Sequence, residues 1–166
     1  MSETYILNLR INAAKCTACR ACELACSFTK EGAFAPGLSR IRVMQLHDVG
    51  FNVPVVCVNC ADAPCIKACP TGAVHRDASV PVVRIKEEDC IGCGDCVVAC
   101  PFGAADMNEE RGVATMCDLC DGKPVCVQHC IYGCLSFAEV LTTAEVKRLA
   151  HAYTVAARYR DARGGE

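Results

Sequence analysis

The sequence predicts an α+β fold in which short strands and short helices form two units, one nested inside the other, with a further helix at the C-terminus. Cysteine makes up 17 of the 166 residues, and 16 of these cysteines fall into four groups with short, regular spacing. The segments that follow the groups resemble one another, which indicates an internal repeat. Segments typical of strands lie before the first group and after the fourth, so the two ends of the repeat can pair.

The four groups share gaps of two to five residues between neighbouring cysteines. In chain order they are Cys16, Cys19, Cys22 and Cys26; Cys57, Cys60, Cys65 and Cys69; Cys90, Cys93, Cys96 and Cys100; and Cys117, Cys120, Cys126 and Cys130.

These cysteines are predicted to bind metal rather than to form disulfides. Their total of 17 is odd, and residues 1–10 contain no basic stretch followed by an apolar run, as a secretory signal would require. Disulfide scaffolds also belong to oxidising compartments. We therefore expect reduced thiols and a cytoplasmic location.

The spacing is typical of [4Fe–4S] clusters. A C-x2-C-x2-C loop wraps three thiolates around three corners of a cubane, and the fourth thiolate comes from another group, so the groups work in pairs. Four groups then imply four clusters. Zinc is the alternative, because C-x2-C knuckles also form tetrahedral sites, but zinc has no need of the third and fourth cysteines at these offsets. A [3Fe–4S] cluster at one site is a further alternative, although no group lacks a cysteine.

The second and third groups read as a complete two-cluster unit. Both end in Cys-Pro and are followed by similar turns at 70–74 and 101–105. By elimination the first group pairs with the fourth, and the strand-like segments at 5–9 and 136–138 flank that pair. A sequential pairing, first with second and third with fourth, stays open.

The nested pairing defines four predicted sites, each with three cysteines from one group and one from its partner. Site 1 is Cys16, Cys19, Cys22 and Cys130; site 2 is Cys26, Cys117, Cys120 and Cys126; site 3 is Cys57, Cys60, Cys65 and Cys100; site 4 is Cys69, Cys90, Cys93 and Cys96. The remaining cysteine, Cys134, is expected to be a buried free thiol.

The predicted domains follow from this pairing. The outer unit covers residues 1–54 and 106–140, the inner unit covers 55–105, and the C-terminal helix and tail cover 141–166. Within them, 80–85 and 40–46 alternate like strands, and the excursion at 27–56 is either a structural hairpin or a docking surface. Residues 142–145 have capping-box spacing, and an apolar stripe follows at Val146, Leu149, Ala150, Tyr153 and Ala157.

Composition excludes several classes of function. The formal net charge is -2, and no basic face typical of a nucleic-acid-binding protein is visible. No run reaches the roughly 18 apolar residues of a membrane span. The sequence has no glycine-rich phosphate loop and no nucleophile paired with a base, which predicts a non-catalytic electron-transfer protein whose clusters carry the chemistry.

The whole chain resembles the four-cluster iron–sulfur subunits of multisubunit oxidoreductases, and most of all the small subunit of tungsten-dependent aldehyde oxidoreductases. The likeness rests on residues 15–28, on Pro36 and on residues 39–43. It implies a relay between a catalytic subunit that holds a tungsten or molybdenum pterin and a flavin subunit that holds FAD and reaches NAD. Those cofactors are expected only in the partners. Ser27 and Ile131 depart from the pattern, since many ferredoxin motifs carry Pro there.

Other functions stay open at this stage. The chain is alternatively a free polyferredoxin carrier, the iron–sulfur subunit of a hydrogenase, formate dehydrogenase or dimethyl sulfoxide reductase type complex, or a redox sensor or cluster-delivery protein. Copies are also expected to stack into a longer conductor through their cluster ends, with the C-terminal helix and Arg158, Arg160 and Arg163 at the contact.

Overall fold

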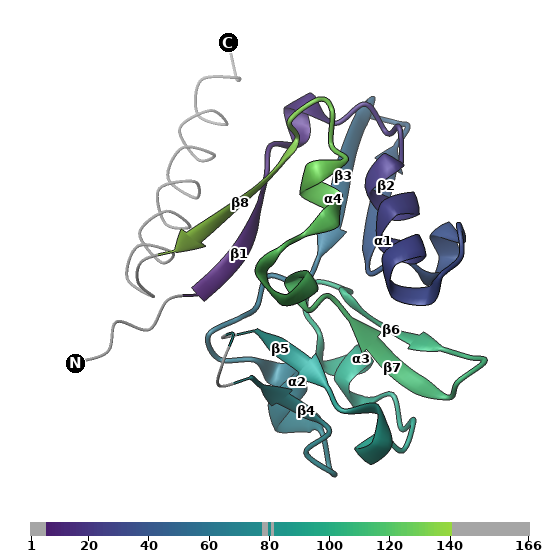
Figure 1. The fold of residues 1–166 in the computed structure, drawn as a ribbon, viewed down its shortest axis with the longest axis vertical. Helices are drawn as coiled ribbons and strands as arrows, with labels where there is room; N and C mark the ends of the chain where they lie inside the picture. The colour runs from purple at the N-terminus through teal and green to yellow at the C-terminus, as the bar shows by residue number, and fades with distance from the viewer. Residues whose placement is uncertain (1–5, 78–79, 81, 141–166) are drawn as a thin grey trace.

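The computed structural model describes residues 6–77, 80 and 82–140, so the predicted helix at 141–166 lies outside the described residues. Within the described part, eight short strands form four two-stranded antiparallel sheets, and four short α-helices lie among them (Figure 1). The predicted mixture of short strands and short helices is confirmed. None of these helices is long and apolar enough to cross a membrane.

The two ends of the described chain pair with each other. Strands β1 (Ile6–Ile11) and β8 (Leu135–Val140) run antiparallel, with Leu9 opposite Phe137. Leu9 and Leu135 are buried, which fixes the register because a slip of one residue would turn them to the other face. The predicted pairing of the strand before the first cysteine group with the strand after the fourth is confirmed.

Helix α1 (Ala21–Glu31) packs against α4 (Val125–Gln128), so a helix from the first cysteine group lies beside one from the fourth. The 3-10 turns η1 (Ala13–Lys15) and η4 (Leu119–Gly122) lie within the same two segments. Between α1 and the second group, η2 (Pro36–Leu38) leads into a hairpin of β2 (Ile41–Leu46) and β3 (Phe51–Val56). The hairpin buries Ile41, Val43 and Val56, so its role is at least structural.

The second and third groups meet through α2 (Pro64–Ala68) and α3 (Asp95–Ala99), which pack together in the lower half of Figure 1. After the second group, β4 (Val74–Arg76) pairs with β5 (Val83–Ile85), and η3 (Glu87–Asp89) follows. After the third group, β6 (Ala105–Asn108) pairs with β7 (Val113–Met116). The alternating pattern predicts a strand over 80–85, and the observed strand, β5, is shorter and covers only Val83–Ile85.

The described residues form two hydrophobic cores. One contains Leu9, Ile41, Val56 and Leu119 from the segments around the first and fourth groups. The other contains Val74, Val83, Ala105, Ala114 and Met116. Hairpin β6–β7 thus shares a core with the inner segments, although the predicted outer unit resumes at residue 106.

Candidate metal centres

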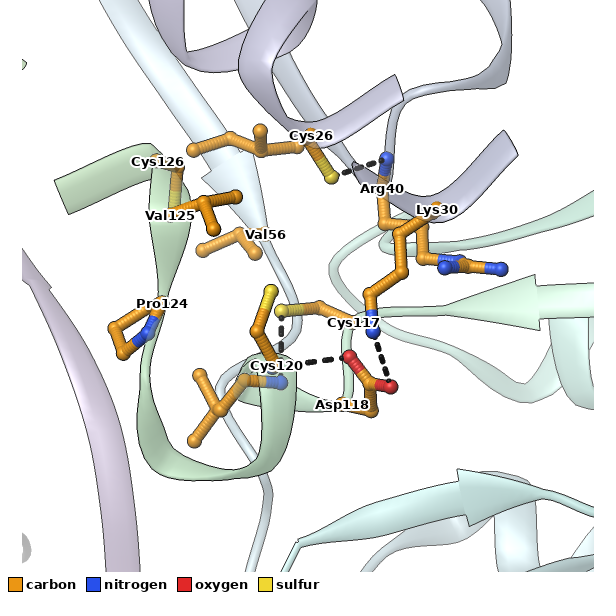
Figure 2. Close-up of a pocket in the computed structure, with 12 residues that line it drawn as sticks. Cys26, Lys30, Arg40, Val56, Cys117, Asp118, Cys120, Pro124, Val125 and Cys126 are labelled. Carbon is orange, nitrogen blue, oxygen red and sulfur yellow. Dashed lines mark hydrogen bonds and ion pairs between the residues drawn. The ribbon is translucent and has the colours of Figure 1, made fainter. Parts of the chain in front are cut away.

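The four cysteines of site 2 line one cavity (Figure 2), which encloses about 290 Å³ when its open mouth is counted. Cys26 comes from α1 and Cys126 from α4, whereas Cys117 and Cys120 come from the loop around η4. Segments about a hundred residues apart therefore bring thiols to the same hollow. This convergence is what the predicted exchange of ligands between the first and fourth groups requires.

Backbone geometry turns this loop around the cavity. Leu119, Cys120 and Asp121 all have positive φ, an uncommon conformation for residues other than glycine. The curl lets the Leu119 N–H approach Cys117 Sγ at 3.5 Å, and the Arg40 N–H approaches Cys26 Sγ at 3.4 Å (Figure 2). N–H groups aimed at sulfur stabilise negative charge on thiolates, so they suit cluster ligands.

The four cysteines of site 1 line a second cavity of about 320 Å³, again with its mouth counted. Cys134 lines it too, so five thiols surround this hollow. Cys134 is 4% exposed, so its expected burial is confirmed, whereas its expected role as a thiol that binds no cluster stays a prediction. Its carbonyl accepts the Asn12 N–H at 2.8 Å, and this bond ties the end of β1 to the start of β8.

The four cysteines of site 3 line a third cavity of about 310 Å³. Apart from cysteine, its described lining is apolar or uncharged and includes Ala63, Val83 and Phe102. Cys100 follows α3 as its C-cap, and its sulfur faces the Ala104 N–H at 3.4 Å. The turn that follows the cysteine thus provides an N–H group to its sulfur. This explains why a similar small turn follows both the second and the third cysteine groups.

The cysteines of site 4 also lie close together. They are near enough for the charges of Cys90, Cys93 and Cys69 to raise the pKa of Cys96. Burial is the largest cause of the rise in that pKa, and the three thiols add to it. The pKa of Cys69 is lowered, mainly by the Val74 N–H, which lies 3.5 Å from its sulfur.

The sites follow one another in a row. Cys22 of site 1 acts on the pKa of Cys126 in site 2, and Cys57 of site 3 acts on that of Cys117 in site 2. Sites 3 and 4 join where α2 packs on α3. Of the 17 cysteines only Cys19 of site 1 and Cys93 of site 4 are exposed. The exposed thiols therefore belong to the two ends of the row.

Burial raises the pKa of eight of the 16 thiols in the four sites, which favours their protonated form when no metal is bound. It raises the pKa of Cys22 and of Cys126 to about 12 and that of Cys57 to about 11. Ligands bind as thiolates, so loading each site must release protons.

The donor sets fit cubane clusters. Each set has four thiols, three sets line a cavity, and N–H groups point at sulfurs in sites 2, 3 and 4. Among the described residues, no three His, Cys, Asp or Glu side chains converge closely enough to hold a single metal ion. Iron–sulfur clusters, when bound, supply one-electron transfer at these positions.

The spacing of cysteines gave no indication of the charged groups beside them. Lys30, Arg40 and Asp118 border the cavity of site 2, and the carboxylate of Glu23 is buried beside Cys22. Glu23 Oε1 accepts the Val43 N–H at 2.6 Å, so it fastens β2 to α1. The position of an acidic residue directly after Cys22 was the signal that the sequence offered for Glu23. No local signal pairs Lys30 with Asp118.

Comparison with known proteins agrees with this geometry. A family model described as a 4Fe-4S dicluster domain matches residues 49–140. The polyferredoxin-like subunit of an aliphatic sulfonate oxidoreductase from Pyrococcus furiosus is 47% identical over 116 residues, which cover 70% of this chain and 66% of that protein. The B subunit of anaerobic dimethyl sulfoxide reductase from Escherichia coli is 35% identical over 150 residues, with 78% and 72% covered.

Two further proteins are similar. The electron transport protein HydN of Escherichia coli is 33% identical over 142 residues, covering 72% of this chain and 80% of HydN. One polypeptide of the active site complex BamBC of benzoyl coenzyme A reductase with 1,5-dienoyl-CoA superposes with a TM-score of 0.50 at 29% identity, covering 82% of this chain and 78% of that one. The family model spans more than half of the sequence, and the chain therefore belongs to the 4Fe–4S dicluster domain family of iron–sulfur proteins.

Proposed function

We propose that the chain is a non-catalytic electron-transfer subunit of a multisubunit oxidoreductase and relays electrons through four [4Fe–4S] clusters at sites 1 to 4. The observation that supports this most is the row of four-thiol sets whose two ends carry the exposed cysteines, Cys19 and Cys93. A relay needs one exposed end for a donor and another for an acceptor. The relatives named as a polyferredoxin-like subunit, a reductase B subunit and an electron transport protein favour the same function.

The cluster load tests this proposal. Protein purified without oxygen is expected to contain about sixteen irons and sixteen acid-labile sulfides per chain, four of each per cubane. About half that load would support two clusters and two unfilled sets. Stoichiometric zinc with little sulfide would overturn the proposal and favour the zinc alternative.

We also propose which kinds of subunit exchange electrons with this chain. A catalytic subunit with a tungsten or molybdenum pterin would exchange electrons with one end, and a flavin subunit with the other. The resemblance to tungsten-dependent aldehyde oxidoreductases supports this choice, and the relatives widen it to sulfonate and dimethyl sulfoxide chemistry.

Isolation from its own cells distinguishes the subunit from a free polyferredoxin, because a subunit elutes with a large cofactor-bearing partner and a carrier elutes alone. The cytoplasmic location stays a prediction that fractionation of those cells tests.

Stacking of copies through their cluster ends also stays a proposal. Its predicted contact at 141–166 lies outside the described residues. The mass distribution of the purified complex with and without residues 142–166 tests it. Higher assemblies that disappear on truncation would support stacking, and one copy per catalytic subunit in both samples would contradict it.

A further inference from the structure

The turn that follows Cys130 has the same backbone geometry as the turns that follow Cys69 and Cys100. In each turn, a glycine three positions after the cysteine has a positive φ and donates its N–H to the cysteine carbonyl. These glycines are Gly72, Gly103 and Gly133, with φ of +71°, +60° and +62° and N–O distances of 3.4, 3.3 and 3.0 Å. The residue four positions after each cysteine therefore takes an equivalent place in all three turns.

That place lies on the wall of a metal site. Ala104, four residues after Cys100, lines the cavity of site 3, and its N–H lies 3.4 Å from Cys100 Sγ. Ala73 has the same position after Cys69. In the third turn the residue is Cys134, which lines the cavity of site 1 together with its four predicted ligands. The methyl group of two turns is thus replaced by a thiol in the third, and that thiol borders a site built of thiols.

Backbone contacts hold Cys134 beside this cavity. Its carbonyl accepts the Asn12 N–H at 2.8 Å, and the next residue, Leu135, begins β8 and lies opposite Ile11 of β1. The Asn12 carbonyl in turn accepts the N–H of Lys15, the residue directly before Cys16, at 3.0 Å. The position of Cys134 is therefore fixed relative to the segment that carries the first ligand of site 1.

Cys130 is the ligand that this thiol is best placed to replace, because both belong to one turn. Proline directly follows Cys69 and Cys100 and restricts φ there, whereas Ile131 follows Cys130. The Ile131 side chain is 80% exposed, so it adds little packing to the turn. Site 1 is also an end of the row, where one cluster cysteine is open to solvent. Of the three equivalent turns, the one without proline is the one that carries a second thiol.

A thiolate from Cys134 is the same kind of donor as one from Cys130. Resting on the proposed function, we propose that Cys134 is a reserve ligand of site 1 and binds the iron that Cys130 releases. In this exchange the bond from Cys130 Sγ to iron breaks and a bond from Cys134 Sγ forms. The Cys134 thiol gives up its proton and the released Cys130 thiolate takes one up, so neither the charge of the site nor the oxidation state of the iron changes.

Two variants at site 1 test this exchange. Cys130→Ala removes the fourth ligand, and because Cys134 takes its place the loaded protein should keep about sixteen irons. Combining Cys130→Ala with Cys134→Ala removes both thiols and should cost about one to four irons, since a cubane short of a cysteine becomes [3Fe–4S] or is lost entirely. Iron and sulfide analysis measures the load, and electron paramagnetic resonance of the oxidised protein detects a [3Fe–4S] cluster.

The equivalent turn at site 3 provides the matched control. Cys100→Ala leaves no thiol at the fourth following position, where Ala104 stands, and should lose iron as the double variant at site 1 does. Adding Ala104→Cys to Cys100→Ala places a thiol on the wall of site 3 and should restore the load. This pair of variants tests the position in the turn, independently of the rest of site 1.

Several outcomes would overturn the proposal. If Cys130→Ala lost as much iron as the double variant, Cys134 would hold nothing in reserve. Loss of iron from Cys134→Ala alone would make Cys134 a resident ligand, and a double variant with its full load would show that neither thiol is needed. Failure of Ala104→Cys to restore site 3 would contradict the equivalence of the turns. Wild-type protein without four clusters would instead count against the proposed function, so the two failures are distinguishable.

Discussion

At the scale of single residues, the assignment of Cys26 to site 2 carries the whole pairing scheme. Cys26 follows Cys22 by four residues, yet the two thiols line different cavities. An α-helix explains this, because α1 continues through both positions and a step of four residues moves a side chain one turn along the axis. Cluster cysteines that are close in sequence are thereby sent to different sites.

Replacing Cys26 with Ala tests that assignment. The variant should lose the cluster held with Cys117, Cys120 and Cys126 and keep the one at Cys16, Cys19 and Cys22. Iron content and the number of electron paramagnetic resonance signals from the reduced protein measure this. Loss of site 3 instead would favour the sequential pairing. Cys134→Ala serves as the control and should keep all of its iron, because Cys134 is a fifth thiol in a site that already has four. A loss of roughly four irons there would make Cys134 a ligand.

Gly92 is a second residue on which a site depends. It lies between Cys90 and Cys93 with φ at +69°, and a Cβ at this position would lie 2.4 Å from the carbonyl oxygen of Gly112. Gly92→Ala should therefore lower the stability of the loop by more than the roughly 1–2 kcal/mol of a left-handed residue alone. The matched control is Gly94→Ala, where φ is +80° but no atom lies within 4 Å. A smaller loss of iron and a smaller drop in Tm are expected for Gly94→Ala, and equal losses would show that the approach to Gly112 has no effect.

At the scale of elements, α1 explains why Ser27 stands where many ferredoxin motifs carry Pro. The helix runs four residues past Ser27 to Glu31, and it must do so to bring Lys30 to Asp118. Ser27 is fully buried, donates its hydroxyl to the Leu24 carbonyl at 3.2 Å and accepts the Ala35 N–H at 3.2 Å. The departure from the motif is therefore part of the packing of the outer unit.

Proline at these two positions should have unequal effects. Ser27→Pro should cost about 3 kcal/mol or more, because it breaks α1 in its interior and leaves the Ala35 N–H without its acceptor. Ile131→Pro should cost much less, since Ile131 is exposed, follows α4 and gives up only its bond to the His129 carbonyl. Chemical denaturation of the two loaded proteins measures the difference. Similar losses would mean that α1 does not need to continue past the cysteine.

How much the sequence predicted differs between elements. Strands β1 and β8 and strand β2 were predicted because alternation and the turn after the cysteines are local signals. The strand expected at 80–85 begins only at Val83, whose N–H donates to the side chain of Asn59, a contact across 24 positions that no local pattern shows. The bridge of Lys30 to Asp118 was not predicted, because the two residues are separated by 88 positions and no local pattern relates one to the other. Whether each four-cysteine set binds a cluster stays a prediction from spacing, which the convergence of the thiols supports.

At the scale of the whole molecule, residues proposed to bind clusters form part of both hydrophobic cores. Of the 12 buried residues in the core around the first and fourth groups, five are cysteines, and four of those five belong to sites 1 and 2. The chain has no Trp and 5% aromatic residues, so little aromatic bulk is available to fill the cores. Two-stranded sheets are only marginally stable by themselves. We therefore expect the fold to depend on bonds from thiol to metal that cross-link distant segments.

Removing the clusters should consequently unfold both units rather than one. Without metal, burial keeps the thiols of Cys22, Cys57 and Cys126 neutral and leaves each cavity without the ligand bonds that joined its walls. Protein treated anaerobically with a chelator and a mild oxidant, then reduced, should lose most of its far-ultraviolet circular dichroism and its cooperative thermal transition. Reconstitution with iron and sulfide should restore both, and mock-treated protein is the control. If the apoprotein kept its spectrum and its Tm, the apolar contacts alone would hold the fold. The cavities would then persist without the bonds that span them, which would contradict the prediction.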